Sequence, residues 1–177
     1  MNKQKQQSRN WLTQAFLILM EEKPYKEISI TKICEKAGLS RKTFYRNFKT
    51  KDELLNEYIK DLCIEYFHQF KHRDDVYLNR VSKIFFSFWG EHKDFLYLLY
   101  KQDLLYILLI QFNKLLPQIY LRYKAFLLDT KDKTEIEYIA YFNAGGFFNL
   151  LVKWLENECK NSPEEMVEII NNFYNLN

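Results

Sequence analysis

The 177-residue chain is 47% hydrophobic and contains only 4 glycine and 3 proline residues, so it is rich in helix formers and poor in turn formers. It shows no convincing alternating strand pattern and no internal repeat, which excludes a β-rich or repetitive fold and predicts an all-α protein of about nine helices. Cys34, Cys63 and Cys159 lie far apart in apolar helical contexts. This spacing argues against a disulfide framework and predicts reduced core residues in a cytoplasmic protein.

Charge is distributed unevenly along the chain, whose net charge is +3. Residues 1–60 carry 13 basic and 7 acidic residues, a net charge of +6, whereas residues 61–177 carry a net charge of −3. Such an asymmetry is expected when one end of a protein meets phosphates. The apolar stretches Leu12–Met20 and Leu104–Ile110 are too short to cross a bilayer, and no cleavage site follows the first, so we expect no membrane partner.

The chain begins with a polar, basic segment, residues 1–10, which we expect to be disordered in the absence of a partner. This segment is either a solubilising terminus or a source of additional contacts to a nucleic acid. The apolar stretch Leu12–Met20 that follows is expected to be a core helix.

A second helix is expected over about Ser29–Ala37, because Ile30, Ile33 and Ala37 fall on one stripe at helical spacing. Ser29 is a suitable N-cap. Gly38 follows at the position where a helix needs a left-handed residue to stop. The spacing therefore predicts a short capped helix that ends in a tight turn.

Ser40 is expected to cap the next helix, on which Phe44 and Phe48 face the core four residues apart. Thr50 and Glu53 form the pattern of a capping box for a further helix. Two short helices across a glycine turn are the plan of a helix-turn-helix, in which the second helix enters the major groove of DNA.

The outward surface of the Ser40–Phe48 helix distinguishes a solvated hairpin from a DNA-binding one. It carries cations, hydroxyls and an amide, and no acidic residue occurs before Asp52. Such groups form hydrogen bonds with phosphates and base edges. The outward residues are Ser40, Arg41, Lys42, Thr43, Tyr45, Arg46 and Asn47. Together with the caps and the glycine spacing, this acid-free surface favours DNA binding over an ordinary helical hairpin.

These motifs resemble the TetR/AcrR family of bacterial transcription regulators. The resemblance covers roughly residues 8–60 and rests on Ile33 and on residues 37–40, 43–48 and 51–55. One departure is Cys34, which stands where many members have alanine, a swap between small buried residues.

The outward face of the Ser40–Phe48 helix and the resemblance together indicate DNA contacts for nine residues. Thr43 and Tyr45 would contact the groove and the backbone, and Lys51 would contact a phosphate. Arg41 and Lys42 lie at variable positions of the family and are the candidates for base discrimination. Ser29, Thr31 and Ser40 sit where members of the family hold the DNA backbone through hydroxyls or helix N-termini. The expected DNA-binding residues are Ser29, Thr31, Ser40, Arg41, Lys42, Thr43, Tyr45, Arg46 and Lys51.

Beyond the helix-turn-helix the chain continues as amphipathic helices. We expect them at Thr50–His72, Val76–Gly90, Lys93–Tyr100, Asp103–Lys124, Thr134–Cys159 and Pro163–Tyr174. Pro117 is expected to kink or break the helix that contains it. The resemblance implies a three-helix DNA-binding domain at residues 1–50 and a helical-bundle effector-binding and dimerisation domain at residues 51–177.

The expected effector-binding domain is rich in aromatic residues, and residues 61–177 hold 24 of the 31. The resemblance implies an effector pocket there, and ligand sites between bundle helices are apolar with a few polar groups. The alternative is a core that simply uses large residues. The candidate pocket residues are Phe85, Trp89, His92, Tyr97, Tyr100, Tyr106, Gln111, Phe112 and Asn143.

The last two helices are predicted to form the interface of a homodimer. Gly145 and Gly146 lie in mid-helix, where each glycine costs about 1 kcal/mol relative to alanine and so indicates a close helix or room for a ligand. Helix-turn-helix regulators read paired half-sites, which favours a dimer over burial of these residues inside the monomer. The candidate interface residues are Gly145, Gly146, Phe148, Leu151, Trp154, Leu155, Met166, Ile169, Ile170 and Phe173.

Enzyme motifs are absent from the sequence: it has no glycine-rich phosphate loop, no nucleophile elbow and no cysteine pair at metal spacing. His68 and His72 lie four residues apart and could bind one metal ion, but the sequence indicates no carboxylate or thiolate as a third metal ligand. We therefore expect no catalytic residues, no metal and no cofactor.

The sequence thus predicts a cytoplasmic, homodimeric regulator of TetR type that binds a palindromic operator in double-stranded DNA and is released by a small-molecule effector. Repression is the usual outcome in the family. An activator that acts with a partner, or a helical protein-interaction adaptor that does not bind DNA, are the alternatives. The sequence specifies neither the operator, the effector, the regulated genes nor the sign of regulation.

Overall fold

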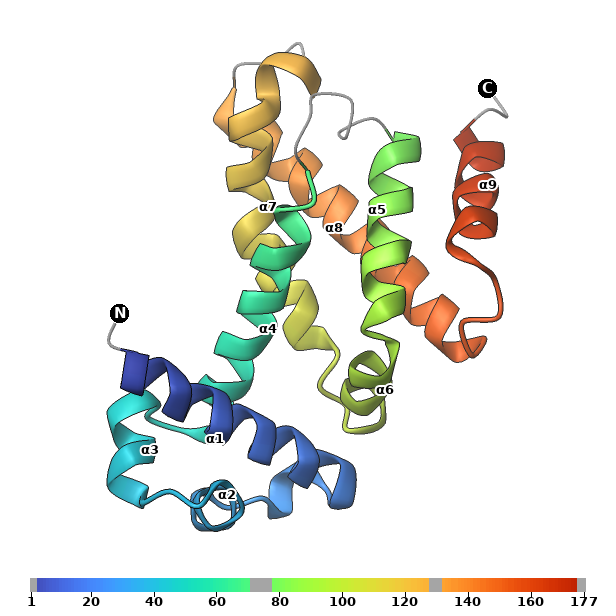
Figure 1. Cartoon of the computed structure of the whole chain (residues 1–177). Coiled ribbons are helices and arrows are strands. Elements are labelled where there is room, and N and C mark those ends of the chain that lie inside the picture. The colour runs from blue at the N-terminus through green and yellow to red at the C-terminus, as the bar shows by residue number, and fades with distance from the viewer. Residues whose placement is uncertain (1–2, 71–77, 128–131, 175–177) are drawn as a thin grey trace. The chain divides into compact units, whose positions relative to one another are not determined.

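The computed structural model describes residues 3–70, 78–127 and 132–174, apart from the side chains of residues 122–127, 173 and 174. Within these ranges the chain forms nine α-helices and one 3-10 helix, with no strand, which confirms the predicted all-α fold (Figure 1). The chain divides into two compact units, residues 1–61 and 62–177, which we call the head and the body.

The head is built from three helices and the start of a fourth. They are α1 (Lys3–Glu22), α2 (Ile30–Ala37), α3 (Arg41–Asn47) and α4 (Lys51–Phe67), with the 3-10 helix η1 (Tyr25–Glu27) between α1 and α2. Helices α1, α2 and α3 pack against one another. The head therefore contains the predicted helix-turn-helix as α2 and α3, supported by α1.

The predicted helix ends of the helix-turn-helix are confirmed. The Ser29 hydroxyl accepts a hydrogen bond from the Lys32 backbone N–H at 3.2 Å, and the Ser40 hydroxyl accepts one from the Thr43 N–H at the same distance. Gly38 has a φ of 64°, in the left-handed region. Its N–H and that of Leu39 donate to carbonyls of the last turn of α2, which ends this helix.

The start of α4 differs slightly from the expected capping box. The Glu53 backbone N–H donates to the Thr50 hydroxyl at 3.0 Å, as predicted. The Glu53 carboxylate, however, accepts a hydrogen bond from the N–H of Lys49, one residue before the capping threonine. Both bonds still satisfy backbone donors next to the helix start.

The core of the head is apolar and aromatic. Phe44 and Phe48 are buried as predicted, and the rings of these two residues lie 5.8 Å apart. Leu12 and Phe16 of α1 and Ile33 of α2 are also fully buried. This burial supplies the stability that the short helices lack by themselves.

The expected disorder of the N-terminal segment is wrong for residues 3–10, which form the first turns of α1. Ser8 is buried, and its hydroxyl donates to the Lys5 carbonyl at 2.9 Å. The Arg9 guanidinium lies 4.7 Å from the centre of the Phe48 ring and 3.8 Å from the Glu57 carboxylate. The Arg9 contacts to Phe48 and Glu57 join to the rest of the head a segment that its polar composition alone left open.

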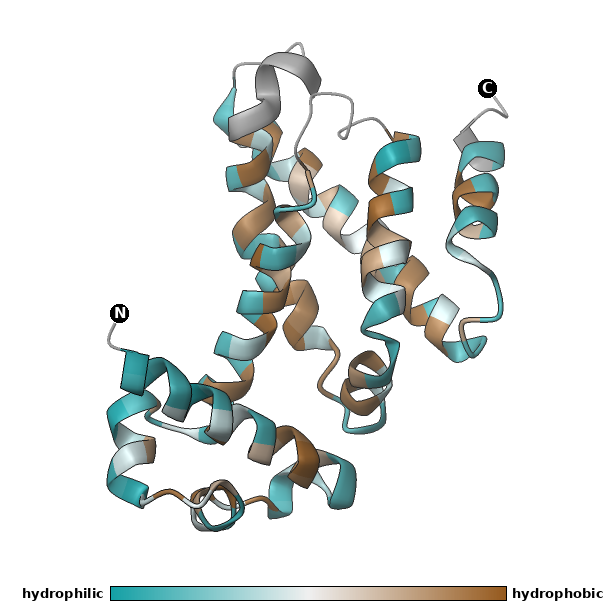
Figure 2. Cartoon of the chain, in the orientation of Figure 1, coloured by the Kyte–Doolittle hydropathy of each residue, from teal (hydrophilic) through white to brown (hydrophobic). Residues whose placement is uncertain are grey.

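The body contains the remaining helices, α5 (Leu78–Glu91), α6 (Lys93–Lys101), α7 (Tyr106–Leu127), α8 (Lys133–Glu156) and α9 (Pro163–Tyr174). Helix α7 packs along α8, and α5 packs along α9. In Figure 2 apolar and polar residues alternate around the helices of the body, as the amphipathic pattern predicted.

The structure decides two predicted helix features in this part of the chain. Helix α4 ends at Phe67 instead of His72, because the chain turns there and brings Phe70 against the rings of Tyr66 and Phe67. Helix α7 continues through Pro117, so the break, one of the two outcomes expected there, does not occur. The expected connectors fall largely on residues 71–77 and 128–131, which lie outside the described residues.

Gly38→Ala is expected to lower the free energy of unfolding by about 1–2 kcal/mol, because a Cβ is disfavoured in the left-handed region. No atom lies within 4 Å of the added Cβ, so the cost comes from the backbone alone. Urea denaturation measures this change. The control is Gly145→Ala, which places a Cβ in open space on a regular helix and should stabilise the protein by about 0.5–1 kcal/mol. Shifts of the same sign in both variants would contradict this account.

Candidate functional site

The exposed face of α3 carries the predicted cationic residues. Lys42 and Arg46 are exposed and lie four residues apart, so both project from the same side of the helix. The Arg41 guanidinium donates to the Tyr45 hydroxyl at 3.3 Å and lies 5.9 Å from the centre of that ring. Tyr45 is 50% exposed. The face therefore presents three cations and a phenol hydroxyl to the solvent.

The hydroxyl residues of the predicted set lie at the starts of α2 and α3. Ser29, Thr31 and Ser40 are exposed. The Ser40 and Thr43 side-chain oxygens lie 3.0 Å apart, within hydrogen-bond distance. Ser29 and Ser40 therefore cap their helices while remaining at the surface, and the two helix N-termini are accessible to an anion such as a phosphate.

Lys51, for which the resemblance implied a phosphate contact, contacts the backbone of the head itself. Its ammonium group donates to the backbone carbonyls of Tyr25 and Ile28 at 2.6 and 2.9 Å, with a weaker contact to the Lys26 carbonyl at 3.5 Å. It also lies 4.4 Å from the centre of the Tyr25 ring. Partial burial lowers the pKa of Lys51. Of the three donors of the ammonium group, two are directed firmly to backbone carbonyls of the head.

Asn47 is likewise turned inward, although the sequence placed it on the outward surface. Its side-chain amide donates to the Ser8 hydroxyl at 3.1 Å and to the Thr43 carbonyl at 2.8 Å. The bond to Ser8 joins the end of α3 to α1, and the bond to Thr43 lies within α3. Asn47 therefore positions the exposed face of α3 and does not belong to it.

Aromatic packing and these polar contacts together fix α3 in the head. Phe44 is fully buried, and Phe48, which follows the helix, is nearly so. In Figure 2 hydrophilic residues dominate α3 and the first turns of α1. The result is a short helix that is held on one side and presents basic and hydroxyl groups on the other. Such groups bind the phosphates and base edges of DNA.

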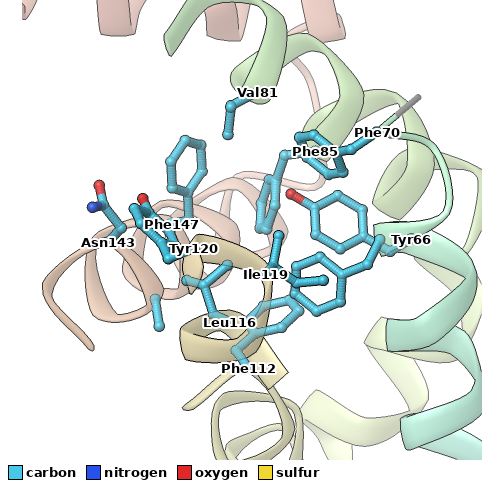
Figure 3. A pocket seen from close by; sticks show the side chains of 12 residues that line it. Tyr66, Phe70, Val81, Phe85, Phe112, Leu116, Ile119, Tyr120, Asn143 and Phe147 are labelled. Atoms are coloured by element: carbon cyan, nitrogen blue, oxygen red, sulfur yellow. The ribbon is translucent and has the colours of Figure 1, made fainter. Parts of the chain in front are cut away.

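The body contains a cavity of about 60 Å³ among aromatic side chains (Figure 3). It is lined by residues from α4, α5, α7 and α8 and from the turn after α4. The lining residues are Tyr66, Phe67, Phe70, Val81, Phe85, Phe112, Leu116, Ile119, Tyr120, Asn143, Ala144 and Phe147. None of these twelve carries a formal charge, and the only polar side-chain groups are two phenol hydroxyls and one amide.

Three of the nine predicted pocket residues, Phe85, Phe112 and Asn143, line this cavity. Trp89 and Gln111 are buried but do not line it, and the Trp89 ring lies 5.7 Å from that of Phe112. These two residues belong to the surrounding core. The sequence pattern did not identify the lining residues from α4 and the later part of α7, because helical spacing alone does not reveal which buried faces leave a gap.

The other predicted pocket residues lie away from the cavity. Tyr100 and Tyr106 are exposed. The Tyr97 hydroxyl donates to the Leu155 carbonyl at 3.1 Å, and burial raises the pKa of Tyr97 to about 12. His92 is half-buried and packs on the Phe88 ring at 4.6 Å. These four side chains therefore contribute to local packing or to the surface.

Half of the predicted dimer residues are buried in the chain's own core. These residues are Leu151, Trp154, Leu155, Met166 and Ile170. Their apolar faces pack within the monomer, as for Trp154 against Phe86 at 5.3 Å, so they offer no surface to a second copy. Gly146 and Ile169 are exposed, and Gly145 and Phe148 are half-buried. The Phe173 side chain lies outside the described residues.

An apolar surface on α8 was missed by the sequence analysis. Tyr138 and Phe142 are each 75% exposed, and Tyr141 and Ile169 are also exposed. A shallow groove of about 360 Å³ adjoins them, between α5, α8 and α9. The signal was present in the sequence, because apolar residues occupy two opposite faces of α8. A single helix in one core needs only one such face.

The described part of the chain offers neither a metal site nor a plain membrane span. No group of three or more histidine, cysteine, aspartate or glutamate side chains is placed to hold a metal ion there; His68 is exposed, and His72 lies outside the described residues. No single described helix is long and apolar enough to cross a membrane, although α6 and the start of α7, which meet at a bend of 119°, reach this length and apolar character as a pair.

Lys51→Met is expected to lower the free energy of unfolding of the head by about 1–3 kcal/mol, because partly buried carbonyls lose a charged donor while the apolar stem is kept. Urea denaturation or amide hydrogen exchange of the head measures the change. The matched control is Lys49→Met, which alters an exposed lysine two residues away. Equal stability of the two variants would show that the Lys51 contacts do not stabilise the head.

Two family models match separate parts of the chain. The model described as bacterial regulatory proteins of the tetR family matches residues 12–58, and the model described as a transcriptional regulator C-terminal region matches residues 78–176. A search of curated proteins finds no match. The first model covers the head, and the second covers more than half of the chain.

Two solved structures share the fold. A TetR transcriptional regulator from Streptococcus agalactiae is 23% identical with a TM-score of 0.67, over 95% of this chain and 93% of that one. A dihydroxyacetone kinase operon activator, DhaS, is 20% identical with a TM-score of 0.62, over 94% of this chain and 93% of that one. With the helix-turn-helix and its exposed basic face, the family matches identify the chain as a DNA-binding transcription regulator of the TetR family.

Proposed function

We propose that the protein is a homodimeric repressor that binds a palindromic operator and leaves it when a small-molecule effector occupies the body. The observation that carries the DNA-binding part is the exposed α3 face with Arg41, Lys42 and Arg46, in a helix that contains no acidic residue. In this proposal α3 enters the major groove. A bacterial regulator of this kind acts in the cytoplasm, where its operator lies.

The residues of α3 divide into two proposed roles. Arg41 and Tyr45 already contact each other, so Tyr45 restricts the guanidinium before DNA is bound. A guanidinium held in this way is suited to bidentate recognition of a guanine edge. Lys42 and Arg46 have no such partner among the described contacts and are suited to phosphates. The serine caps at the starts of α2 and α3 are suited to phosphates as well.

The proposed dimer forms through the exposed apolar surface of α8 and α9. Tyr138, Tyr141, Phe142 and Ile169 supply this surface, which we call the α8–α9 face. Contiguous exposed apolar residues commonly mark a protein–protein interface, because their burial against a partner removes apolar area from water. A two-fold dimer would present two α3 helices to two half-sites of a palindrome.

The proposed effector site is the aromatic cavity of the body. Helix α4 carries Lys51, which contacts η1 in the head, and Tyr66 and Phe67, which line the cavity. We propose that a ligand acts on DNA binding through this helix. For that to happen, the ligand must bind the DNA-free conformation more tightly than the DNA-bound one.

The sign of regulation has two candidates. Repression is the usual outcome in the family. Activation is the second candidate, because the structurally similar DhaS is described as an operon activator. A reporter gene behind the operator distinguishes them: deletion of the regulator raises transcription for a repressor and lowers it for an activator.

Genome-fragment selection with the purified protein, repeated across salt concentrations, tests the proposed function as a whole. We expect recovery of a palindrome whose half-sites lie about one or more helical turns apart. We also expect binding that falls steeply with salt, because phosphate contacts release counterions. Weak retention that is insensitive to salt, with no enriched sequence, would contradict operator binding.

Arg46→Gln is expected to flatten the salt dependence of DNA binding. The slope of the logarithm of the binding constant against the logarithm of the salt concentration should become shallower by about 0.9 for each phosphate that is no longer neutralised, or by about 1.8 for a dimer. Lys51→Met is expected to weaken binding through the stability of the head while the slope stays unchanged. Titrations at several salt concentrations measure both slopes. Lys101→Gln, which removes an exposed charge from the body, is the control. An unchanged slope in Arg46→Gln would exclude its proposed phosphate contact.

Phe142→Glu is expected to convert the dimer to monomers, because it places a charge in the proposed α8–α9 interface. Phe142 is so exposed that the fold of the monomer should not change. Sedimentation velocity measures the mass, and circular dichroism checks the helix content. The control is Tyr106→Glu, which adds the same charge at an exposed aromatic position of α7. A Phe142→Glu variant that sediments as a dimer would place the interface elsewhere.

A further inference from the structure

We infer that the body cavity opens at Phe147 to take an uncharged, mainly apolar molecule about the size of one aromatic ring. Both the class of ligand and the route by which it enters the cavity follow from the residues that line it. Only the claim that this ligand regulates DNA binding rests on the proposed function.

The chemistry of the lining selects an uncharged ligand. Nine of the twelve lining side chains are hydrocarbons or aromatic rings, and none is a carboxylate, an ammonium, a guanidinium or an imidazole. A buried ion without a partner of opposite charge costs several kcal/mol, whereas an apolar ligand gains from leaving water. Aromatic walls also favour a flat ring, through edge-to-face and offset contacts. The lining therefore suits an uncharged ring and disfavours its ionised relatives.

One polar group, the Tyr66 hydroxyl, favours one orientation of a ligand in the cavity. Figure 3 shows the Tyr66 hydroxyl pointing toward the middle of the surrounding aromatic side chains. Burial raises the pKa of Tyr66, so its hydroxyl keeps its proton and is able to donate a hydrogen bond. The Asn143 amide N–H₂ donates to the Ile139 carbonyl at 2.9 Å, which holds this side chain in place on the opposite wall. A ligand with one hydroxyl or carbonyl oxygen fits this arrangement.

The size of the cavity requires one wall to move. About 60 Å³ holds a few water molecules and is below the range of about 300–1,000 Å³ that is usual for ligand pockets. The neighbouring groove on the other side of α8 has about 360 Å³. Phe147 and Asn143 line both spaces, so these two side chains form the wall between them.

Phe147 is the part of this wall that has room to move. It is half-buried, and its ring packs on Phe85 at a centroid distance of 5.0 Å. Gly146 precedes it, and a Cβ there would meet no atom within 4 Å, so the groove is open beside Phe147. Rotation of the Phe147 ring into the groove would join the two spaces. The groove adjoins Phe142 and Ile169 of the α8–α9 face, so this rotation would also change the proposed dimer surface.

The test uses isothermal titration calorimetry of the full-length protein without DNA. The probes are benzyl alcohol and benzoate, which share a ring and differ in charge. We expect benzyl alcohol to bind at least about tenfold more tightly than benzoate, because the lining lacks a cationic partner for a carboxylate. Equal or tighter binding of benzoate would overturn the inferred ligand class.

The variants test the wall and the hydroxyl. Phe147→Ala, or the milder Phe147→Leu if the first fails to fold, should bind benzyl alcohol several-fold more tightly, because the space is already open. The matched control is Phe148→Ala, which removes the neighbouring half-buried ring of α8 that does not line the cavity. Tyr66→Phe should weaken binding of benzyl alcohol but not of toluene. Identical affinities of the Phe147 and Phe148 variants would overturn the opening at Phe147.

Failure of this inference is distinguishable from failure of the proposed function. If neither the wild type nor a folded Phe147 variant binds benzyl alcohol or toluene, the inferred site is wrong, although the operator selection can still succeed. If the probes bind as expected and the operator selection fails, the cavity is a ligand site and the proposed regulation is wrong.

Discussion

The placement of α3 depends on the burial of two phenylalanine rings. A helix of seven residues is too short to be stable in water, so its position must come from tertiary contacts. Phe44 and Phe48 provide them, packed with the apolar side of α1, and the Asn47 amide adds a bond to Ser8. This anchoring leaves the opposite face of α3 free for Lys42 and Arg46. Without it, the basic residues would not share one surface, and a groove of DNA would meet no defined pattern of donors.

Polar residues in the head therefore serve two purposes that the sequence does not separate. Lys51 and Lys42 are both lysines in a basic segment, yet Lys51 directs its donors to backbone carbonyls while Lys42 remains exposed. Arg9 packs over Phe48 and faces Glu57, whereas Arg46 is exposed. Charges that hold the head together contribute to affinity by keeping α3 in place. Charges that are exposed contribute directly, through phosphates and bases.

The aromatic residues of the body are divided in a similar way. Tyr66, Phe85 and Phe112 pack around a small internal space, while Tyr138 and Phe142 lie at the surface. The first group suits an uncharged ring, and the second suits a second copy of the chain. Asn143 and Phe147 of α8 lie between these two regions. In the proposed mechanism a ligand that displaces Phe147 therefore changes both the cavity and the dimer surface, in addition to acting through α4.

The local features of the head were determined by the sequence alone. Capping serines, a left-handed Gly38 and the four-residue spacing of Phe44 and Phe48 depend on interactions within a few residues, and all of them were predicted. The same holds for the all-α class, which follows from composition and periodicity.

Only the tertiary structure decided which side chains of a given type are buried, paired or free. In it, Lys51 donates hydrogen bonds to the Tyr25 and Ile28 carbonyls, Leu151 and Trp154 are buried within the monomer, and Phe142 is exposed. The tertiary structure also set the cavity among Tyr66, Phe112 and Phe147, of which the sequence had indicated only Phe112. Helical periodicity identifies the apolar faces of each helix. It does not show which faces meet, because that depends on packing between residues far apart in the chain.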